Sequence, residues 1–142
     1  PPLLDELGLA GAVEDYAAGF AARSGLQVTT DVSGAWPRLP REMELSLFRV
    51  VQESLANVHR HSGSASAAIR LCVEAGRLRV EVRDAGRGLP ADMSGPTGGA
   101  RIGVGLTGMR ERLRQWAGEL EIESSTQGTT VTASLPCPPE AS

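Results

Sequence analysis

Residues 85–105 limit the folds that this chain can adopt, because they interrupt an otherwise regular pattern of helices and strands. These twenty-one positions contain seven glycines, two prolines and few apolar side chains. A loop of this length inside a small domain is usually functional. A chain of 142 residues suits one compact domain. We therefore expect one domain over residues 1–138, built around a long functional loop, and a disordered tail at residues 139–142.

The segments on either side of this loop show clear periodicity. Apolar residues at helical spacing predict helices at 8–25, 41–61 and 106–118. Alternation of apolar and polar residues predicts five strands, at 26–34, within 64–76, and at 77–84, 119–125 and 129–136. Helices and strands are segregated rather than strictly alternating. We predict an α+β fold, a two-layer α/β sandwich in which three helices cover one face of a mostly antiparallel five-stranded sheet, while the other face is partly solvated or covered by something outside this segment.

Composition and charge exclude several classes of protein. The net charge is −3 without a basic cluster, which argues against direct binding of nucleic acid. Cys72 and Cys137 form no CxxC pair and have no zinc-site spacing with the two histidines, so we interpret them as unpaired thiols in a reducing compartment. No apolar run is long enough to cross a bilayer. The chain opens on PPLLDELG without a methionine, and we expect a segment of a longer protein.

Glu53, Asn57 and His61 are each four residues apart in the helix predicted at 41–61. At this spacing they line up within two helical turns, about 6 Å from one to the next. They lie at the border of the apolar stripe, whose predicted members are Leu47, Val50, Val51, Ser54, Leu55 and Val58. An ordinary polar helix face would look the same, so this motif gains weight only from the motifs that follow it.

Asp84 ends a predicted strand and is followed by Gly86 and Gly88. A carboxylate in this position can point into a cavity while the glycines let the main chain pass close to a ligand. An ionised aspartate only accepts hydrogen bonds, which suits the exocyclic amino group of a ring such as adenine. The alternative is an ordinary hairpin end, but a hairpin would not need the twenty irregular residues that follow.

Two further glycine motifs occur in the second half of the chain. Gly103 and Gly105 precede the helix predicted at 106–118, and bare N–H groups at a helix start can bind an anion. Gly128-Thr129 at a strand start could place a hydroxyl in the same cavity. No GxxxxGK[ST] sequence occurs, which excludes a P-loop, and the glycines follow no strand of a βαβ unit, which excludes a Rossmann fold.

Together, in this order, the four motifs resemble those of the GHKL ATPases, which include gyrase B and the sensor histidine kinases. Glu53-x-x-x-Asn57-x-x-x-His61 is similar to the N box and Asp84-x-Gly86-x-Gly88 to the G1 box. Gly103-x-Gly105-Leu106 is similar to the G2 box and Gly128-Thr129 to the last box. The resemblance covers about residues 8–136. The resemblance is closest to sensor histidine kinases that pair with NarL-type response regulators, and three segments carry it: FRVVQESLANVHRHSGSASA, GLTGMRERL and PPLLDELGL. A phenylalanine-bearing F box is missing.

This resemblance implies the Bergerat fold with ATP and Mg²⁺ as ligands, and it implies a role for each site residue. Asn57 would bind Mg²⁺ through its side-chain oxygen, and Glu53 would act one turn away as the catalytic base or through water. Arg60 and His61 would approach the phosphates. Asp84 would accept the adenine amino hydrogen, supported by Thr129 through a shared water. Residues 89–102 would be the ATP lid, and the remaining contacts would come from Gly86, Gly88, Gly103, Val104, Gly105 and Leu106.

The resemblance also implies a catalytic domain that transfers the γ-phosphoryl of ATP to a histidine on dimerisation helices absent from this segment. His59 and His61 are poor substitutes, so we expect the isolated domain to bind ATP–Mg²⁺ with little or no turnover. The implied partners are those helices, within a homodimeric parent, and a NarL-type response regulator. The implied location is the cytoplasm, with a parent that is either membrane-anchored or free.

Two alternative functions stay open. One is a GHKL serine kinase of the anti-sigma-factor type, against which the linker-like start and GLTGMRERL argue. The other is a non-catalytic adenine-nucleotide-binding module, against which the presence of both Glu53 and Asn57 argues. A DNA-gating ATPase is the least favoured, because the chain lacks the transducer domain that such machines require.

Overall fold

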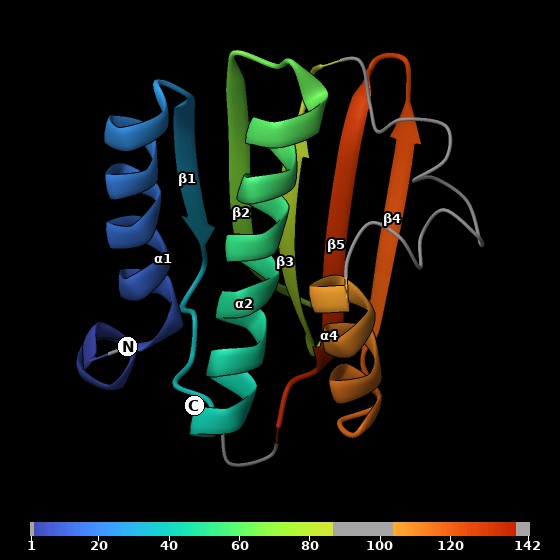
Figure 1. Cartoon of the computed structure of the whole chain (residues 1–142). Helices are drawn as coiled ribbons and strands as arrows, with labels where there is room; N and C mark the ends of the chain where they lie inside the picture. Colours follow the sequence, from blue (N-terminus) through green and yellow to red (C-terminus); the bar gives the residue numbers. More distant parts are fainter. Residues whose placement is uncertain (1, 87–103, 139–142) are drawn as a thin grey trace.

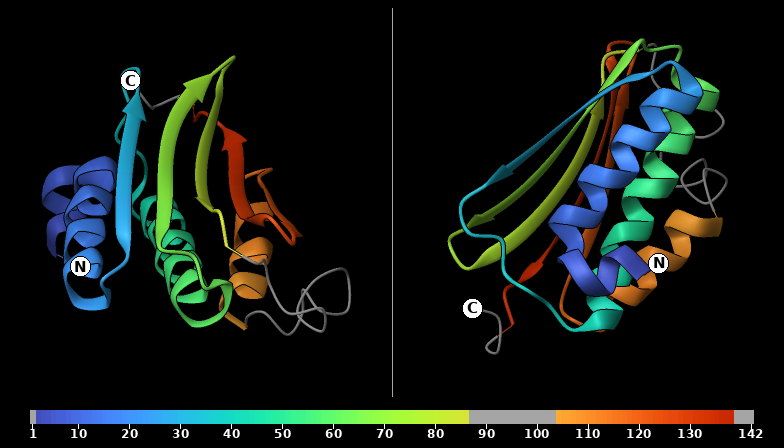
Figure 2. Two further views of the ribbon diagram at one scale, coloured as in Figure 1. Left: turned by 90° about the horizontal axis from the view of Figure 1, so that it is seen from above. Right: turned by 90° about the vertical axis from the view of Figure 1, so that its left-hand side faces the viewer.

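The computed structural model describes residues 2–86 and 104–138, which form a single sheet covered on one side by helices (Figures 1 and 2). The five strands have the order β1-β2-β3-β5-β4. The α+β prediction is therefore confirmed, with three described helices on one face. In chain order the elements are α1 (Pro2–Ser24), β1 (Gln27–Ser33), α2 (Arg41–Asn57), the π-helical segment η1 (Val58–Ser62), β2 (Ser66–Glu74), β3 (Arg77–Asp84), α4 (Val104–Arg114), β4 (Glu119–Ser125) and β5 (Gly128–Pro136).

The pairing of the strands is mostly antiparallel, as predicted. Only β1 and β2 run parallel within the described sheet, and α2 forms the crossover between them. β2 and β3 form the predicted tight hairpin. Its two turn residues, Ala75 and Gly76, have φ values of 52° and 75°. Positive φ at both positions gives the backbone twist that two-residue hairpins favour.

The core lies between the helices and the sheet. The apolar stripe predicted for the helix at 41–61 is confirmed over α2 and the first residue of η1, because all of its members are at most 5% exposed: Leu47, Val50, Val51, Ser54, Leu55 and Val58. Facing them are apolar residues of the central strands, such as Ile69, Val80 and Ala133. Burying these aliphatic side chains provides the main favourable contribution to folding, since aromatics make up only 4% of the chain.

The opposite face of the sheet is polar and largely exposed, in agreement with the expectation of partial solvation. Arg70 pairs with Asp31 of β1 on one side, at 3.8 Å from Nε to Oδ2, and lies opposite Glu81 of β3 on the other. Cys72 is the exception to the predicted alternation. It lies opposite Arg79 on this polar face, yet it is only 7% exposed. Both cysteines are free thiols, as expected.

α1 differs from the prediction at its start. The helix was expected at 8–25, but α1 begins at Pro2 and bends at Gly8, whose φ of 74° and ψ of −177° are not helical. Its positive φ favours glycine, and a Cβ at this position would also displace the Arg38 side chain, which it would approach to 2.7 Å. The end of α1 agrees with the prediction, because Gly25 has a φ of 80° and its N–H bonds to the Ala21 carbonyl.

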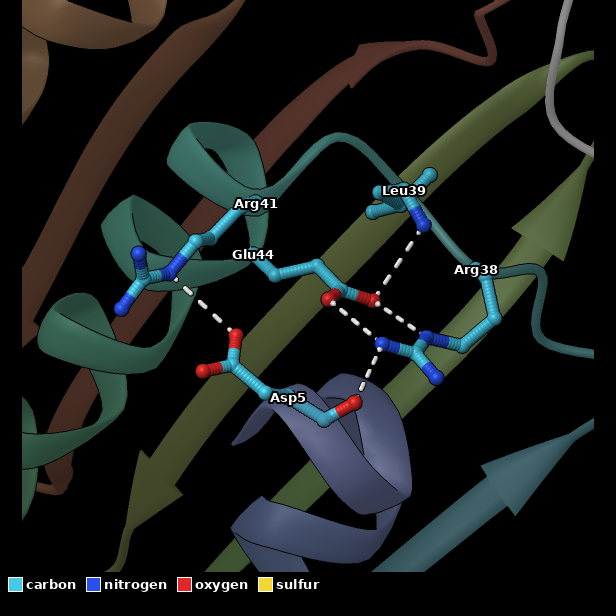
Figure 3. Close-up of polar contacts among 5 residues, drawn as sticks. All are labelled: Asp5, Arg38, Leu39, Arg41 and Glu44. Carbon is cyan, nitrogen blue, oxygen red and sulfur yellow. Dashed lines mark hydrogen bonds and ion pairs between the residues drawn. The ribbon is translucent and has the colours of Figure 1, made fainter. Parts of the chain in front are cut away.

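A cluster of polar contacts fastens the first turn of α1 to the start of α2 (Figure 3). The Glu44 carboxylate is 2% exposed and accepts hydrogen bonds from the Arg38 guanidinium at 3.3 Å and the Leu39 N–H at 3.2 Å. Arg38 also donates to the Asp5 carbonyl at 3.0 Å, and Arg41 pairs with the Asp5 carboxylate at 3.2 Å. We call these five residues the Glu44 cluster. The contacts of Asp5 with Arg38 and Arg41 are the ones that join α1 to the segment around the start of α2.

The end of α4 also differs in detail from the prediction, which placed the helix at 106–118 and its stop at Gly118. α4 runs from Val104 to Arg114, and the left-handed residue after it is Ala117, with a φ of 57°. The Gly118 N–H then bonds to the Leu113 carbonyl at 2.8 Å. A Cβ at Gly118 would lie 2.9 Å from that carbonyl oxygen, so this glycine serves close packing. Within the described ranges, no helix has the length and apolarity needed to cross a membrane.

Candidate functional site

The predicted site residues gather at the end of the sheet where α2 stops. α2 packs against β3, β5 and α4, and η1 packs against β5. Asn57 is the last residue of α2, Asp84 is the last residue of β3, and Thr129 is the second residue of β5. Figure 1 shows these three element ends together at the upper edge of the molecule. Three motifs that are distant in sequence therefore share one region.

Asp84 and Thr129 are held on neighbouring strands by their backbone register. Arg83 lies opposite Thr130, and Asp84 and Thr129 are each 7% exposed. A Cβ at Gly128 would overlap the Asp84 carbonyl oxygen, so glycine at this position lets β5 start directly beside the end of β3. The Asp84 carboxylate accepts the Gly86 N–H at 2.9 Å, and the Thr129 hydroxyl pairs with the Ser124 hydroxyl at 3.0 Å. Both polar side chains are thus buried and oriented.

Asn57 lies deeper than its motif predicted. It is 6% exposed, and its Oδ1 accepts a hydrogen bond from the Arg60 guanidinium at 3.0 Å, whereas Arg60 itself is exposed. The predicted α-helix does not continue to residue 61, because the chain becomes π-helical from Val58 to Ser62. The wider turn of a π-helix breaks the strict four-residue alignment, so half-buried His61 does not continue the line of Glu53 and Asn57.

Glu53 is half-buried and lies one turn before Asn57 on α2. Burial raises the pKa of the Tyr16 hydroxyl above its usual value; nearby Arg23 lowers this pKa, and the Glu53 carboxylate raises it. Aromatic contacts join α1 and α2, with Tyr16 edge-on to Phe48 at 5.5 Å between centroids. His59 was expected to face solvent, and it is exposed, with its ring edge-on to Phe20 of α1.

The glycine-rich part of the predicted site lies mostly outside the described residues. This applies to Gly88, to the lid expected at 89–102 and to Gly103. Val104 and Gly105 open α4, so their backbone belongs to the first turn of that helix. Leu106 is 2% exposed and belongs to the core, which leaves its backbone as the part that could serve a ligand.

Two hollows border Asp84 on the strand side. One has a volume of about 290 Å³ and is lined by residues of β3, β4 and β5, and the other has about 390 Å³ and is lined by residues of β1, β2 and β3. Both include Arg83, whose side chain is exposed on the polar face, and neither includes a residue of α2. They therefore reach the Asp84 end of the predicted site from the strands and do not extend to α2.

The buried polar side chains indicate the location of the candidate site better than the two hollows do. In the described part of the chain these residues are Glu44, Ser46, Ser54, Asn57, Asp84 and Thr129. Glu44 belongs to the Glu44 cluster, and the Ser46 hydroxyl donates to the Glu42 carbonyl at 2.9 Å. The other four lie at the C-terminal end of α2 and on the strands beneath it. Ser54 is not among the residues predicted for the site, because it falls in the predicted apolar stripe and its spacing gives no indication of whether its hydroxyl has a partner.

The chain matches one family model and several sensor kinases. Residues 42–139 match the model for histidine kinase-, DNA gyrase B- and HSP90-like ATPases. The sensor histidine kinase MctS of Rhizobium johnstonii is 41% identical over 136 residues, which are 96% of this chain and 29% of MctS. The sensor histidine kinase NarS of Mycobacterium tuberculosis is 34% identical over 139 residues, which are 96% of this chain and 31% of NarS.

A solved structure shares the fold. The histidine kinase domain of the blue-light activated histidine kinase from Erythrobacter litoralis matches with a TM-score of 0.68 and 27% identity. The match covers 90% of this chain and 60% of that domain. The chain spans about a third of the length of the curated relatives MctS and NarS.

Proposed function

Because the chain belongs to the family of histidine kinase-, DNA gyrase B- and HSP90-like ATPases, we propose that residues 1–138 are the ATP-binding catalytic domain of a sensor histidine kinase. The observation that carries this proposal is the gathering of buried polar side chains where α2, β3 and β5 meet. Asn57, Asp84 and Thr129 are each at most 7% exposed there. A purely structural core would place aliphatic side chains in these positions.

Asp84 is the proposed base-recognition residue. Its carboxylate is held by the Gly86 N–H, so it points in a fixed direction without a rearrangement on binding. An ionised carboxylate accepts but cannot donate, and it therefore pairs with the exocyclic amino group of adenine rather than with the carbonyl of guanine. Thr129, fixed by Ser124, supports the carboxylate from the neighbouring strand.

Asn57, Arg60 and the start of α4 are the proposed phosphate and metal side of the site. The Asn57 amide oxygen is a hard ligand of the kind that Mg²⁺ takes, and Mg²⁺ leaves its other positions to phosphates and water. When bound, Mg²⁺ would neutralise charge on the β- and γ-phosphates. Arg60, exposed beside Asn57, and His61 would turn towards those phosphates.

Phosphoryl transfer itself requires an acceptor placed in line with the γ-phosphate. We propose that Glu53 accepts the proton of a histidine on the dimerisation helices of the parent protein. Glu53 is half-buried one turn before Asn57, at the border between core and solvent. The parent would act as a homodimer in the cytoplasm and pass the phosphoryl group to a response regulator of the NarL type.

The nucleotide site is tested by calorimetric titration of the chain with ATP, once with Mg²⁺ and once with EDTA. Wild type should bind more tightly with Mg²⁺, and Asn57→Ala should remove this difference while keeping the binding measured in EDTA. Gln52→Ala, a half-buried polar residue of the same helix, is the control and should bind like wild type. Equal Mg²⁺ dependence in wild type and Asn57→Ala would contradict the assignment of the metal site.

The kinase assignment is tested by comparing the chain with its full-length parent in labelled ATP. The parent should acquire acid-labile phosphohistidine, and the chain alone should acquire little or none. Acid-stable phosphoserine on a partner would instead support a serine kinase of the anti-sigma-factor type. Nucleotide binding without any transfer by the parent would support a non-catalytic binding module.

A further inference from the structure

The Ser54 hydroxyl is the group at the C-terminal end of α2 that neither the core nor the roles given above explain. Ser54 is 1% exposed, and its Oγ has no hydrogen-bond partner among residues 2–86 and 104–138. A buried hydroxyl without a partner destabilises a fold, and such groups are rare in native proteins. Alanine would fill the same place without this cost. The hydroxyl therefore points to a role in binding.

The position of Ser54 fits the purine end of the proposed site. It belongs to the buried stripe of α2 that packs on β3 and β5, and it comes one turn before Asn57, roughly 4.5 Å along the helix axis. The buried polar side chains on these two strands are Asp84 of β3 and Thr129 of β5. Ser54 thus completes a set of three buried polar groups from three elements that pack together.

Building on the proposed function, in which Thr129 supports Asp84 through a shared water, we infer that Ser54 is a specificity-determining residue whose hydroxyl is a third protein partner of that water beside the purine base. A buried water makes about three hydrogen bonds to polar groups. The Asp84 carboxylate only accepts, whereas the hydroxyls of Ser54 and Thr129 can each donate or accept. The water can therefore donate to Asp84, bond to both hydroxyls and still present a donor or acceptor to the ring.

The test uses ADP in EDTA, which leaves the base contacts and removes the metal. Ser54→Ala should weaken ADP binding roughly three- to tenfold, the effect of one hydrogen bond, and should weaken ATP–Mg²⁺ binding by the same factor. Ser46→Ala is the matched control, because Ser46 is equally buried on the same helix but its hydroxyl bonds to Glu42. It should bind ADP like wild type. Without nucleotide, Ser54→Ala should unfold at the same temperature as wild type or higher.

Three outcomes would overturn the inference. In the first, Ser54→Ala binds ADP as tightly as wild type. In the second, it loses affinity for ATP–Mg²⁺ but not for ADP in EDTA, which would place the hydroxyl at the phosphates. In the third, it loses affinity and unfolding temperature together, as a merely structural residue would. A wild-type chain that binds neither ADP nor ATP would instead contradict the proposed function, so the two failures are distinguishable.

Discussion

The two ends of α2 bury polar side chains in opposite ways. At the N-terminal end, the Glu44 carboxylate and the Ser46 hydroxyl are almost fully buried and bonded within the protein. At the C-terminal end, the Ser54 hydroxyl has no partner in the described part of the chain, and the Asn57 oxygen meets the exposed Arg60. Polar groups that are satisfied internally stabilise a fold, whereas groups left ready at a buried position are typical of ligand sites. The difference separates a structural end of this helix from the end that carries the proposed site.

The largest effect is expected at the structural end. Glu44→Ala should lower the free energy of unfolding by about 3 kcal/mol, because it leaves the Leu39 N–H without its acceptor and Arg38 without its main charge partner. Denaturant unfolding measures this loss, while ATP affinity of the folded protein should not change. Glu42→Ala, an exposed residue paired with Arg112 across the surface, is the control and should cost less than about 1 kcal/mol. A loss of ATP affinity in Glu44→Ala would contradict the assignment of a purely structural role to this end of α2.

Gly128 lies in the proposed site, but its substitution should reduce both stability and nucleotide binding, so it does not fit the division into structural and binding residues. Gly128→Ala should cost roughly 2 kcal/mol of stability and also weaken nucleotide binding, because the new Cβ would push β5 away from Asp84. Gly76→Ala separates this clash from backbone strain. Gly76 also has a positive φ, of 75°, but a Cβ there meets nothing within 4 Å. If both variants lost the same stability and neither lost affinity, strain alone would explain the effect.

Substitution of Asp84 should reduce ATP affinity more than stability, the opposite of the effect expected at Glu44. Asp84→Asn keeps an oxygen for the Gly86 N–H but replaces a charged acceptor by an amide, so ATP affinity should fall roughly tenfold to a hundredfold. Calorimetric titration measures this change. The free energy of unfolding should stay within about 1 kcal/mol of wild type. A large loss of stability with unchanged affinity would place Asp84 with the structural residues.

The smallest effect is expected away from both ends of α2. Ala117 has a φ of 57°, which costs an L-residue energy that glycine does not incur. Ala117→Gly should therefore raise the free energy of unfolding by about 0.5 kcal/mol, after subtraction of the added chain entropy. Ala18→Gly, at an exposed position in the interior of α1, should lower it by about 1 kcal/mol. Stabilisation by both changes would contradict this explanation.

Much of the fold could be predicted from the sequence because its signals are local. The apolar stripe of α2, the Ala75-Gly76 turn and the cap at Gly25 all follow from side-chain spacing and glycine chemistry. The sequence could not predict the bend at Gly8 or the π-helical turn after Asn57. Gly8 lies against Arg38, thirty residues away in the chain, and η1 packs against β5, so both features involve contacts that local spacing does not reveal.

The candidate site divides in the same way. Glu53, Asn57 and Asp84 belong to motifs whose spacing is visible in the sequence. Ser54 does not, because a serine in an apolar stripe gives no indication of whether its hydroxyl has a partner. That question is decided by tertiary packing, which also buries Asn57 more deeply than helical spacing indicated.

The charged face of the sheet has a consequence for the alignment of β2 with β3. In the observed register Arg70 lies opposite Glu81 and Glu74 lies opposite Arg77. A shift of two residues keeps every side chain on its own face, so the hydrophobic core alone penalises it weakly. Such a shift in either direction would bring Arg70 opposite another arginine, Arg79 or Arg83, and like charges in that position repel. The solvent-facing charges therefore destabilise hairpins in which β2 and β3 are out of register. The correct register places Asp84 at the end of β3, where a ligand would contact it.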